Sequence, residues 1–120
     1  MIYKISKMAK INFDVVLKNL IGKPLKDNDG ADLTMARACR NALCMTGEGV
    51  KGDVKYDQYA LAMKVGGGGD VELKSEEITK IKKSVGANMF VIVVGPVWDF
   101  LEGKIPEAYR DDVKNPPKAN

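Results

Sequence analysis

The chain has 120 residues, 45% of them hydrophobic and 29% charged, and its 19 basic and 16 acidic side chains give a net charge of +3. These values are typical of one globular domain and exclude both a disordered chain and a pair of domains. The sequence contains no histidine, which removes the commonest general base, the commonest zinc ligand and every histidine-activated nucleophile. We therefore expect a protein that is not an enzyme and that holds no cofactor and no metal.

The first ten residues are basic and lack the apolar segment of a signal peptide. We interpret residues 1–10 as an N-terminal extension, and either Met1 or Met8 as the initiator. No apolar run approaches the roughly 20 residues that span a bilayer, so no membrane association is expected. Cys39 and Cys44 lie five positions apart in a predicted helix, too far for a relaxed disulfide, which favours free thiols and a cytoplasmic protein.

A period of two predicts a β-strand that begins at Ile11 and carries Phe13, Val15 and Leu17 on one face. Gly22 then indicates a turn. Residues 23–26 can return as a second strand, which Pro24 would confine to a sheet edge because proline has no N–H group. We expect an N-terminal β-hairpin over residues 11–26, with three lysines on it: Lys18, Lys23 and Lys26.

Residues 27–32 form a polar loop with three carboxylates, Asp27, Asp29 and Asp32. A calcium-binding EF-hand loop is excluded because no register places oxygens and glycine at the required positions. Asp29 and Asp32 are also the carboxylates that an enzyme without histidine would have to use, but they form no recognisable catalytic pair. The loop is better explained as a turn followed by a helix N-cap.

The first helix is expected over residues 33–44, capped by Asp32 or Thr34. Arg37 and Arg40 lie one turn apart and away from its apolar face. They are candidates for contact with phosphate or an acidic partner, and a merely solvated helix face is the alternative.

A second helix is expected over residues 54–65, with Tyr56, Tyr59 and Met63 on one side. Gly66 can end this helix, and residues 66–69, all glycine, are predicted to be a flexible connector. Residues 71–73 then form a short strand or an extended approach.

Ser75, Glu76 and Glu77 are a strong signal for the start of a third helix, which Gly86 should end. Its outer face carries a cluster of three lysines: Lys80, Lys82 and Lys83.

Residues 87–103 support two interpretations. Apolar residues recur at helical spacing, whereas the β-branched run over 91–94 favours a strand and Pro96 interrupts a helix. We favour a helix that begins near Asn88 and is kinked or split at Gly95-Pro96, over a strand at 89–94 followed by a helix. Trp98 falls off the apolar stripe, so it either covers the core edge or contacts a partner. Residues 104–120 are expected to be a flexible tail in which Ile105 and Tyr109 can dock locally.

Several stretches give the chain a resemblance to a group of small phage and prophage proteins of unassigned function. The matching stretches are 16–25, 33–34, 59–64, 71–73, 77–78, 81–82, 93–95 and 101–103. The resemblance favours a helix across position 96, where the group lacks the proline of this chain. It implies a phage or prophage origin and carries no functional residues.

The sequence thus predicts an α+β domain over residues 11–103, with an N-terminal β-hairpin packed on about four helices. The favoured function is a non-enzymatic phage accessory protein in the bacterial cytoplasm, which binds a host or phage protein or itself. The candidate contacts are Arg37, Arg40, Trp98 and Tyr109. The alternative is a nucleic-acid-binding module that uses the hairpin and helix lysines, although the charge is modest.

Overall fold

The computed structural model describes residues 8–45 and 49–110. Its elements are β1 (Ala9–Asn12), α1 (Met35–Leu43), α2 (Gly52–Gly66), β2 (Asp70–Leu73), α3 (Ser75–Asn88), α4 (Val91–Leu101) and the 3-10 helix η1 (Glu107–Tyr109). The predicted α+β class, with two antiparallel strands and four α-helices, is confirmed. The choice between Met1 and Met8, the rest of the N-terminal extension and residues 111–120 of the predicted tail lie outside the described residues.

The first strand pairs with a segment about 60 residues away. β1 and β2 form a two-stranded antiparallel sheet in which Ala9 lies opposite Leu73 and Asn12 opposite Asp70. The strand therefore begins two residues before the predicted domain boundary. The predicted return strand at 23–26 is wrong as the partner of this strand, because it contributes only isolated bridges, such as Lys18 to Pro24.

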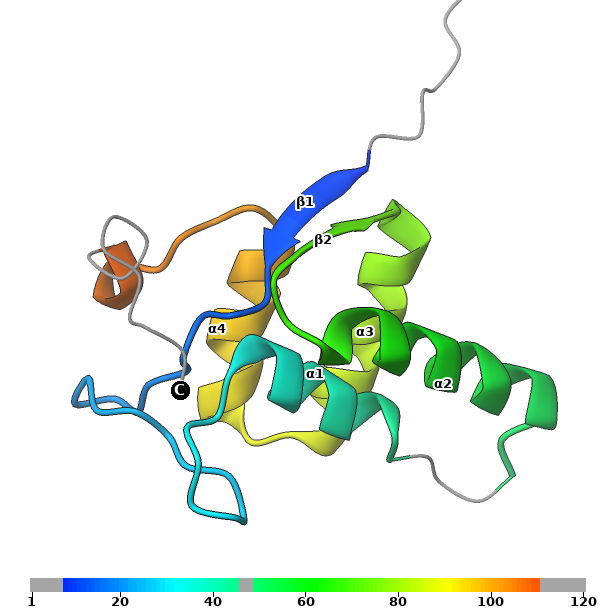
Figure 1. The fold of residues 1–120 in the computed structure, drawn as a ribbon, viewed down its shortest axis with the longest axis horizontal. Coiled ribbons are helices and arrows are strands. Elements are labelled where there is room, and N and C mark those ends of the chain that lie inside the picture. Colours follow the sequence, from blue (N-terminus) through cyan, green and yellow to red (C-terminus); the bar gives the residue numbers. More distant parts are fainter. Residues whose placement is uncertain (1–7, 46–48, 111–120) are drawn as a thin grey trace, which may run out of the picture.

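Residues 17–32 instead form two successive turns, here named the first loop (residues 17–24) and the second loop (residues 25–32). A closed ring of three backbone hydrogen bonds joins the first residue of each loop and the residue that follows the second loop. The Leu17 N–H donates to Leu33, the Leu33 N–H to Leu25 and the Leu25 N–H to Leu17, each at 2.8 Å. Figure 1 shows both loops projecting from the blue and cyan part of the chain beside α1.

The glycine stretch 66–69 was predicted to be a flexible connector. Gly66 is instead the last residue of α2, and the three glycines that follow it form a hydrogen-bonded turn. Gly68 has φ +78° and approaches Asp14 so closely that a Cβ atom would lie 2.5 Å from its Oδ1. The same carboxylate oxygen accepts a hydrogen bond from the Gly69 N–H at 2.8 Å, and the Gly69 carbonyl accepts one from Phe13. These contacts bring β2 into register with β1.

The core lies between the sheet and helices α1, α3 and α4, and its largest fully buried side chains include Phe13, Leu17, Met35, Leu73 and Ile81. α1 contacts α2 and α3, and α3 contacts α4. The helical interpretation of residues 87–103 is confirmed, but the helix begins at Val91 and not near Asn88, which is the last residue of α3. α4 is one helix that contains Pro96, so it is not split there.

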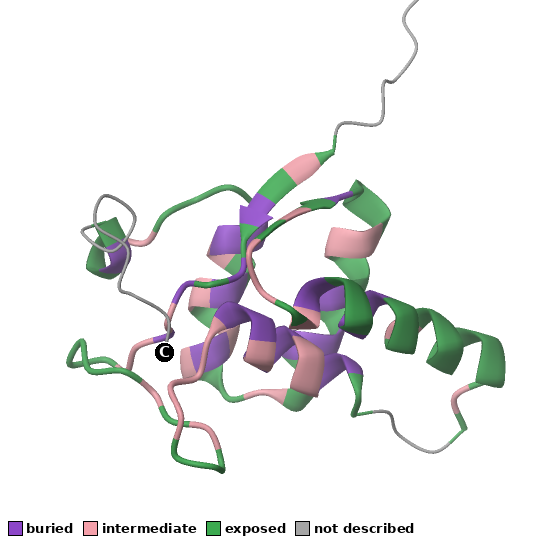
Figure 2. Ribbon diagram, in the orientation of Figure 1, coloured by how far each residue is buried: buried purple, intermediate pink, exposed green. Residues whose placement is uncertain are grey.

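Helix α3 continues to Asn88, so Gly86 does not end it as predicted. Its missing Cβ serves another purpose: a Cβ would lie 3.2 Å from Cζ2 of Trp98, whose ring lies against this position. In α2, only Leu61, Ala62 and Val65 are buried. Figure 2 shows the first half of that helix mostly exposed, with Gln58 half-buried.

Candidate functional site

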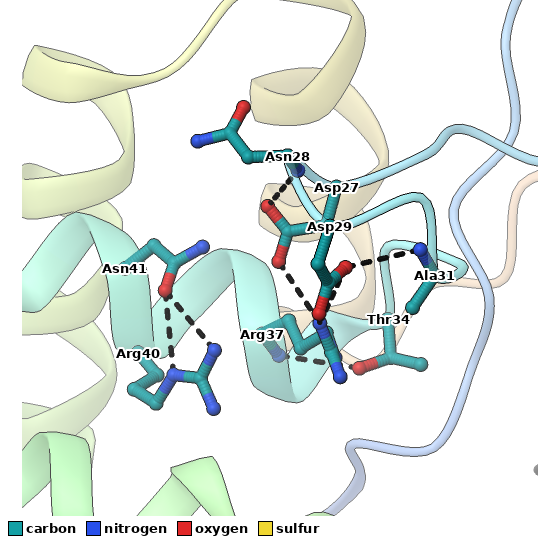
Figure 3. Close-up of polar contacts among 8 residues, drawn as sticks. All are labelled: Asp27, Asn28, Asp29, Ala31, Thr34, Arg37, Arg40 and Asn41. Atoms are coloured by element: carbon teal, nitrogen blue, oxygen red, sulfur yellow. Dashed lines mark hydrogen bonds and ion pairs between the residues drawn. The ribbon is translucent and has the colours of Figure 1, made fainter.

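The second loop is attached to α1 by the polar cluster in Figure 3. Thr34 caps α1, because its hydroxyl accepts a hydrogen bond from the Arg37 N–H at 3.2 Å. The Arg37 guanidinium donates to Asp27 at 3.2 Å and to Asp29 at 3.0 Å. Arg37, which the sequence offered as a phosphate or partner contact, is thus already paired with two carboxylates of its own chain.

These contacts also shift the ionisation of the pair. The hydrogen bond from the Ala31 N–H, followed by that from Arg37, lowers the pKa of Asp29 below its ordinary value. The carboxylates of Asp29 and Asp27 raise the pKa of Arg37. Both changes favour the charged forms, so the cluster acts as an electrostatic clasp between the loop and the helix.

Arg40 lies one turn further along α1, where its side chain is half-buried. Its Nε and Nη2 donate to Asn41 Oδ1 at 3.3 and 3.2 Å, and its aliphatic part lies against Gly66 at the end of α2. An open hollow of about 460 Å³ is lined by both arginines together with Asp27 and Asp29. Because these four charges cancel, the hollow has no net attraction for a phosphate group.

The other two predicted contact residues hold the fold together. Trp98 is 38% exposed; its Nε1 donates to the Lys82 carbonyl at 3.1 Å, and the Lys82 ammonium lies 4.6 Å from the ring centroid. It therefore covers the core edge between α3 and α4. Tyr109 is only 3% exposed and packs edge-on against Phe100 with centroids 5.2 Å apart, so this part of the predicted tail is docked on the domain.

Most of the predicted phosphate-binding lysines have partners within the chain. Lys26 pairs with Asp32, Lys80 with Asp57 and Lys82 with Glu102, while the Lys18 ammonium donates to the Ala108 carbonyl. Within the described part of the chain, Lys23 and Lys83 make no ion pair. The six lysines therefore do not form one continuous basic patch with free charges.

The first loop presents the most exposed large apolar residue of the described chain. Leu20 is 94% exposed and its neighbour Ile21 77%. Asn19 holds this Leu20–Ile21 tip in place, because its Oδ1 accepts hydrogen bonds from the N–H groups of Ile21 and Lys23, both at 3.0 Å. The tip is thus apolar, exposed and built on a hydrogen-bonded turn.

Sequence reasoning missed this tip, although a signal was present. Residues 17–24 read LKNLIGKP and residues 25–32 read LKDNDGAD, so leucine, lysine and glycine recur with a period of eight. Gly22 and Gly30 both have positive φ, +84° and +83°. The repeat identifies Leu20–Ile21 and Asn28–Asp29 as equivalent positions.

Helix α2 presents a second apolar surface. Tyr56, Tyr59 and Met63 are exposed at spacings of three and four residues, on the side opposite the buried Leu61 and Val65. The two tyrosine rings lie 6.1 Å apart. Phe90, which precedes α4, and Val91, the first residue of α4, are exposed as well.

Groups of three or more histidine, cysteine, aspartate or glutamate side chains that suit a metal ion are absent from residues 8–45 and 49–110. In the same ranges no helix combines the length and the apolar character needed to cross a bilayer. Both cysteines are free thiols, and burial raises the pKa of Cys39 to about 12.

Comparisons of the chain with protein families, with curated proteins and with solved structures found no match.

Proposed function

We propose that this chain is a small, non-enzymatic accessory protein of phage or prophage origin that acts in the bacterial cytoplasm by binding another protein. The observation that carries the proposal is the Leu20–Ile21 tip, which exposes two large aliphatic side chains on a hydrogen-bonded turn. The resemblance to small phage proteins supports the origin, and the two free thiols are compatible with a reducing compartment.

The second loop shows that the turn itself does not need apolar residues. There the equivalent positions are Asn28 and Asp29, on a turn with the same glycine conformation and the same pattern of backbone hydrogen bonds. Full burial of a leucine or isoleucine side chain contributes about 1.5–3 kcal/mol. Leu20 and Ile21 provide almost none of this to the fold, so it remains available for a partner.

The charge of the first loop indicates the kind of partner. The loop has two lysines, Lys18 and Lys23, and no acidic residue. An apolar pocket with carboxylates at its rim would bury Leu20 and Ile21 and attract the exposed Lys23. Two aliphatic side chains are too few to hold a protein on a bilayer, since even a myristoyl chain binds only marginally, so a protein partner is favoured over a lipid surface.

Helix α2 offers a second surface that could bind a protein. Tyrosine is one of the residue types enriched at the energetic centre of interfaces, and Tyr56 and Tyr59 are both exposed beside Met63. This face suits either a larger interface with the same partner or association of two copies. Nucleic acid is less well supported because four of the six candidate lysines have partners within the chain.

Site-specific photocrosslinking in the producing cell tests the proposal. A photoreactive amino acid at position 20 should give a discrete crosslinked product, whereas one at the equivalent position 28 should give none. The product should disappear when Ile21→Asp is added. A product of two 13.1-kDa chains would identify the partner as a second copy, and light scattering would then show a dimer. Equal products from both positions, or none from either, would contradict binding through the tip.

A further inference from the structure

We infer that the free edge of β1 is a second binding site, which accepts an extended peptide strand of another protein with alternating acidic and aliphatic residues. This inference is independent of the Leu20–Ile21 tip. It rests on three observations: unpaired backbone groups along β1, an apolar groove beside them, and lysines on both sides of that groove.

The register of the sheet determines which backbone groups are unpaired. The Phe13 N–H donates to the Gly69 carbonyl at 2.9 Å, and Ile11 lies opposite Val71 in the same ladder. Because hydrogen-bonded pairs alternate in an antiparallel sheet, the N–H and C=O groups of Lys10 and Asn12 point away from β2. Neither backbone makes a further hydrogen bond in the described chain, so β1 offers an open edge for strand addition.

A groove of about 200 Å³ lies beside this edge. β1 and Val15 line one part of it, and Phe100 with residues 103–105 line the rest. Ile11, Val15 and Phe100 are otherwise buried core residues, so the groove opens onto the core. It has room for one aliphatic side chain of a strand placed along β1.

The chain itself shows which strand suits β1. On its paired edge lies β2, with the sequence Asp-Val-Glu-Leu, in which Glu72 is opposite Lys10 while Val71 and Leu73 face the core. On the free edge, Lys10 and Lys104 both line the groove. A strand of the same alternating kind would therefore direct its acidic residues toward the lysines and an aliphatic residue into the groove.

Titration of the ¹⁵N-labelled full chain with an acetylated and amidated peptide of sequence GDVEL, that of residues 69–73, tests this inference. Amide resonances of Lys10, Asn12 and Ile105 should shift, with a dissociation constant of about 1 mM or tighter. A peptide N-methylated at alternate amides should not bind, because it cannot complete the ladder. A peptide with lysines in place of both acids should bind more weakly.

Lys104→Glu should weaken binding about fivefold, because it reverses a charge beside the groove. Lys104 forms an ion pair with Glu102 at 3.5 Å, but its side chain is 69% exposed. The variant should therefore keep its fold and change thermal unfolding only slightly. Lys55→Glu, at another exposed position on α2, is the matched control and should bind normally. The inference is overturned if no resonances shift, if the shifts avoid β1, or if the N-methylated peptide binds as well as the parent.

Discussion

The first and second loops follow the same path and carry opposite surfaces. In each, a glycine of positive φ donates its N–H to the third residue of the loop, Asn19 or Asp27, at 3.0 and 2.9 Å. The first loop has two lysines, no acid and an apolar tip, whereas the second has one lysine, three aspartates and a polar tip bound to Arg37. The comparison shows that the turn requires the glycine and the ring of leucine backbones. The residues at the tip can differ without changing the turn.

The largest effect on stability should come from the leucine side chains at the start of each loop. Leu17 is fully buried, whereas Leu25 is only half-buried. Leu17→Ala should lower the free energy of unfolding by about 2–5 kcal/mol, because it leaves a cavity in the core. Leu25→Ala should cost clearly less, and urea denaturation measures both. Equal losses would show that the two loop bases are packed alike.

The two glycines should respond alike if the turns are equivalent. Gly22→Ala and Gly30→Ala each place a Cβ at positive φ, which costs about 1–2 kcal/mol, and neither Cβ would meet a neighbouring atom. Thermal and urea unfolding should therefore give the same loss for both variants. A difference larger than about 0.5 kcal/mol would show that the loops differ in strain as well as in surface.

Loss of Arg37 should affect the second loop and leave the first loop unchanged. Arg37→Ala removes the clasp on the second loop and should lower the free energy of unfolding only modestly, because the pair is partly exposed to solvent. Hydrogen exchange should speed up at Ala31, whose N–H donates to Asp29, and stay unchanged at Ile21 in the first loop. Faster exchange at both positions would mean that the loops open together.

Acid should weaken the attachment of the second loop to α1, as the loss of Arg37 does. The pKa of Asp29 is lower in the folded protein than its ordinary value of 3.8. Its contribution to stability is therefore complete above pH 3.8 and is lost as the pH falls through the folded pKa. Asp29→Asn should flatten the decrease in stability below that pH, while Asn28→Asp, which adds a carboxylate one residue away, should not. An unchanged slope in Asp29→Asn would remove this carboxylate from the clasp.

The smallest effect on stability should come from the tip. The double variant Leu20→Asn, Ile21→Asp copies the second loop onto the first and should change the free energy of unfolding by less than about 0.5 kcal/mol, because both side chains are exposed. The same variant should abolish crosslinking from a photoreactive group at position 23. A large loss of stability would instead assign the tip a role in folding.

Local patterns predicted the helical elements and the class. The Ser75-Glu76-Glu77 start marked α3, and the apolar spacing through Pro96 favoured the helix that forms α4. The pairing of β1 with β2 was not predictable in this way, since register between distant segments depends on the turn that Gly68 and Gly69 make against Asp14. Whether each of the candidate contact residues faces solvent or its own chain also depends on tertiary packing.

Tyr109 shows this dependence most clearly, because a charged, proline-containing segment has no local pattern that indicates docking. Its hydroxyl accepts a hydrogen bond at 2.6 Å from the N–H of Lys18, 91 positions earlier in the chain. Ribosomes add about 5–20 residues per second, so the first loop waits roughly 5–20 s for this partner during synthesis. A nascent chain thus presents Leu20 and Ile21 before the loop has all its native contacts, and a partner or a chaperone can meet the tip while the protein is still being made.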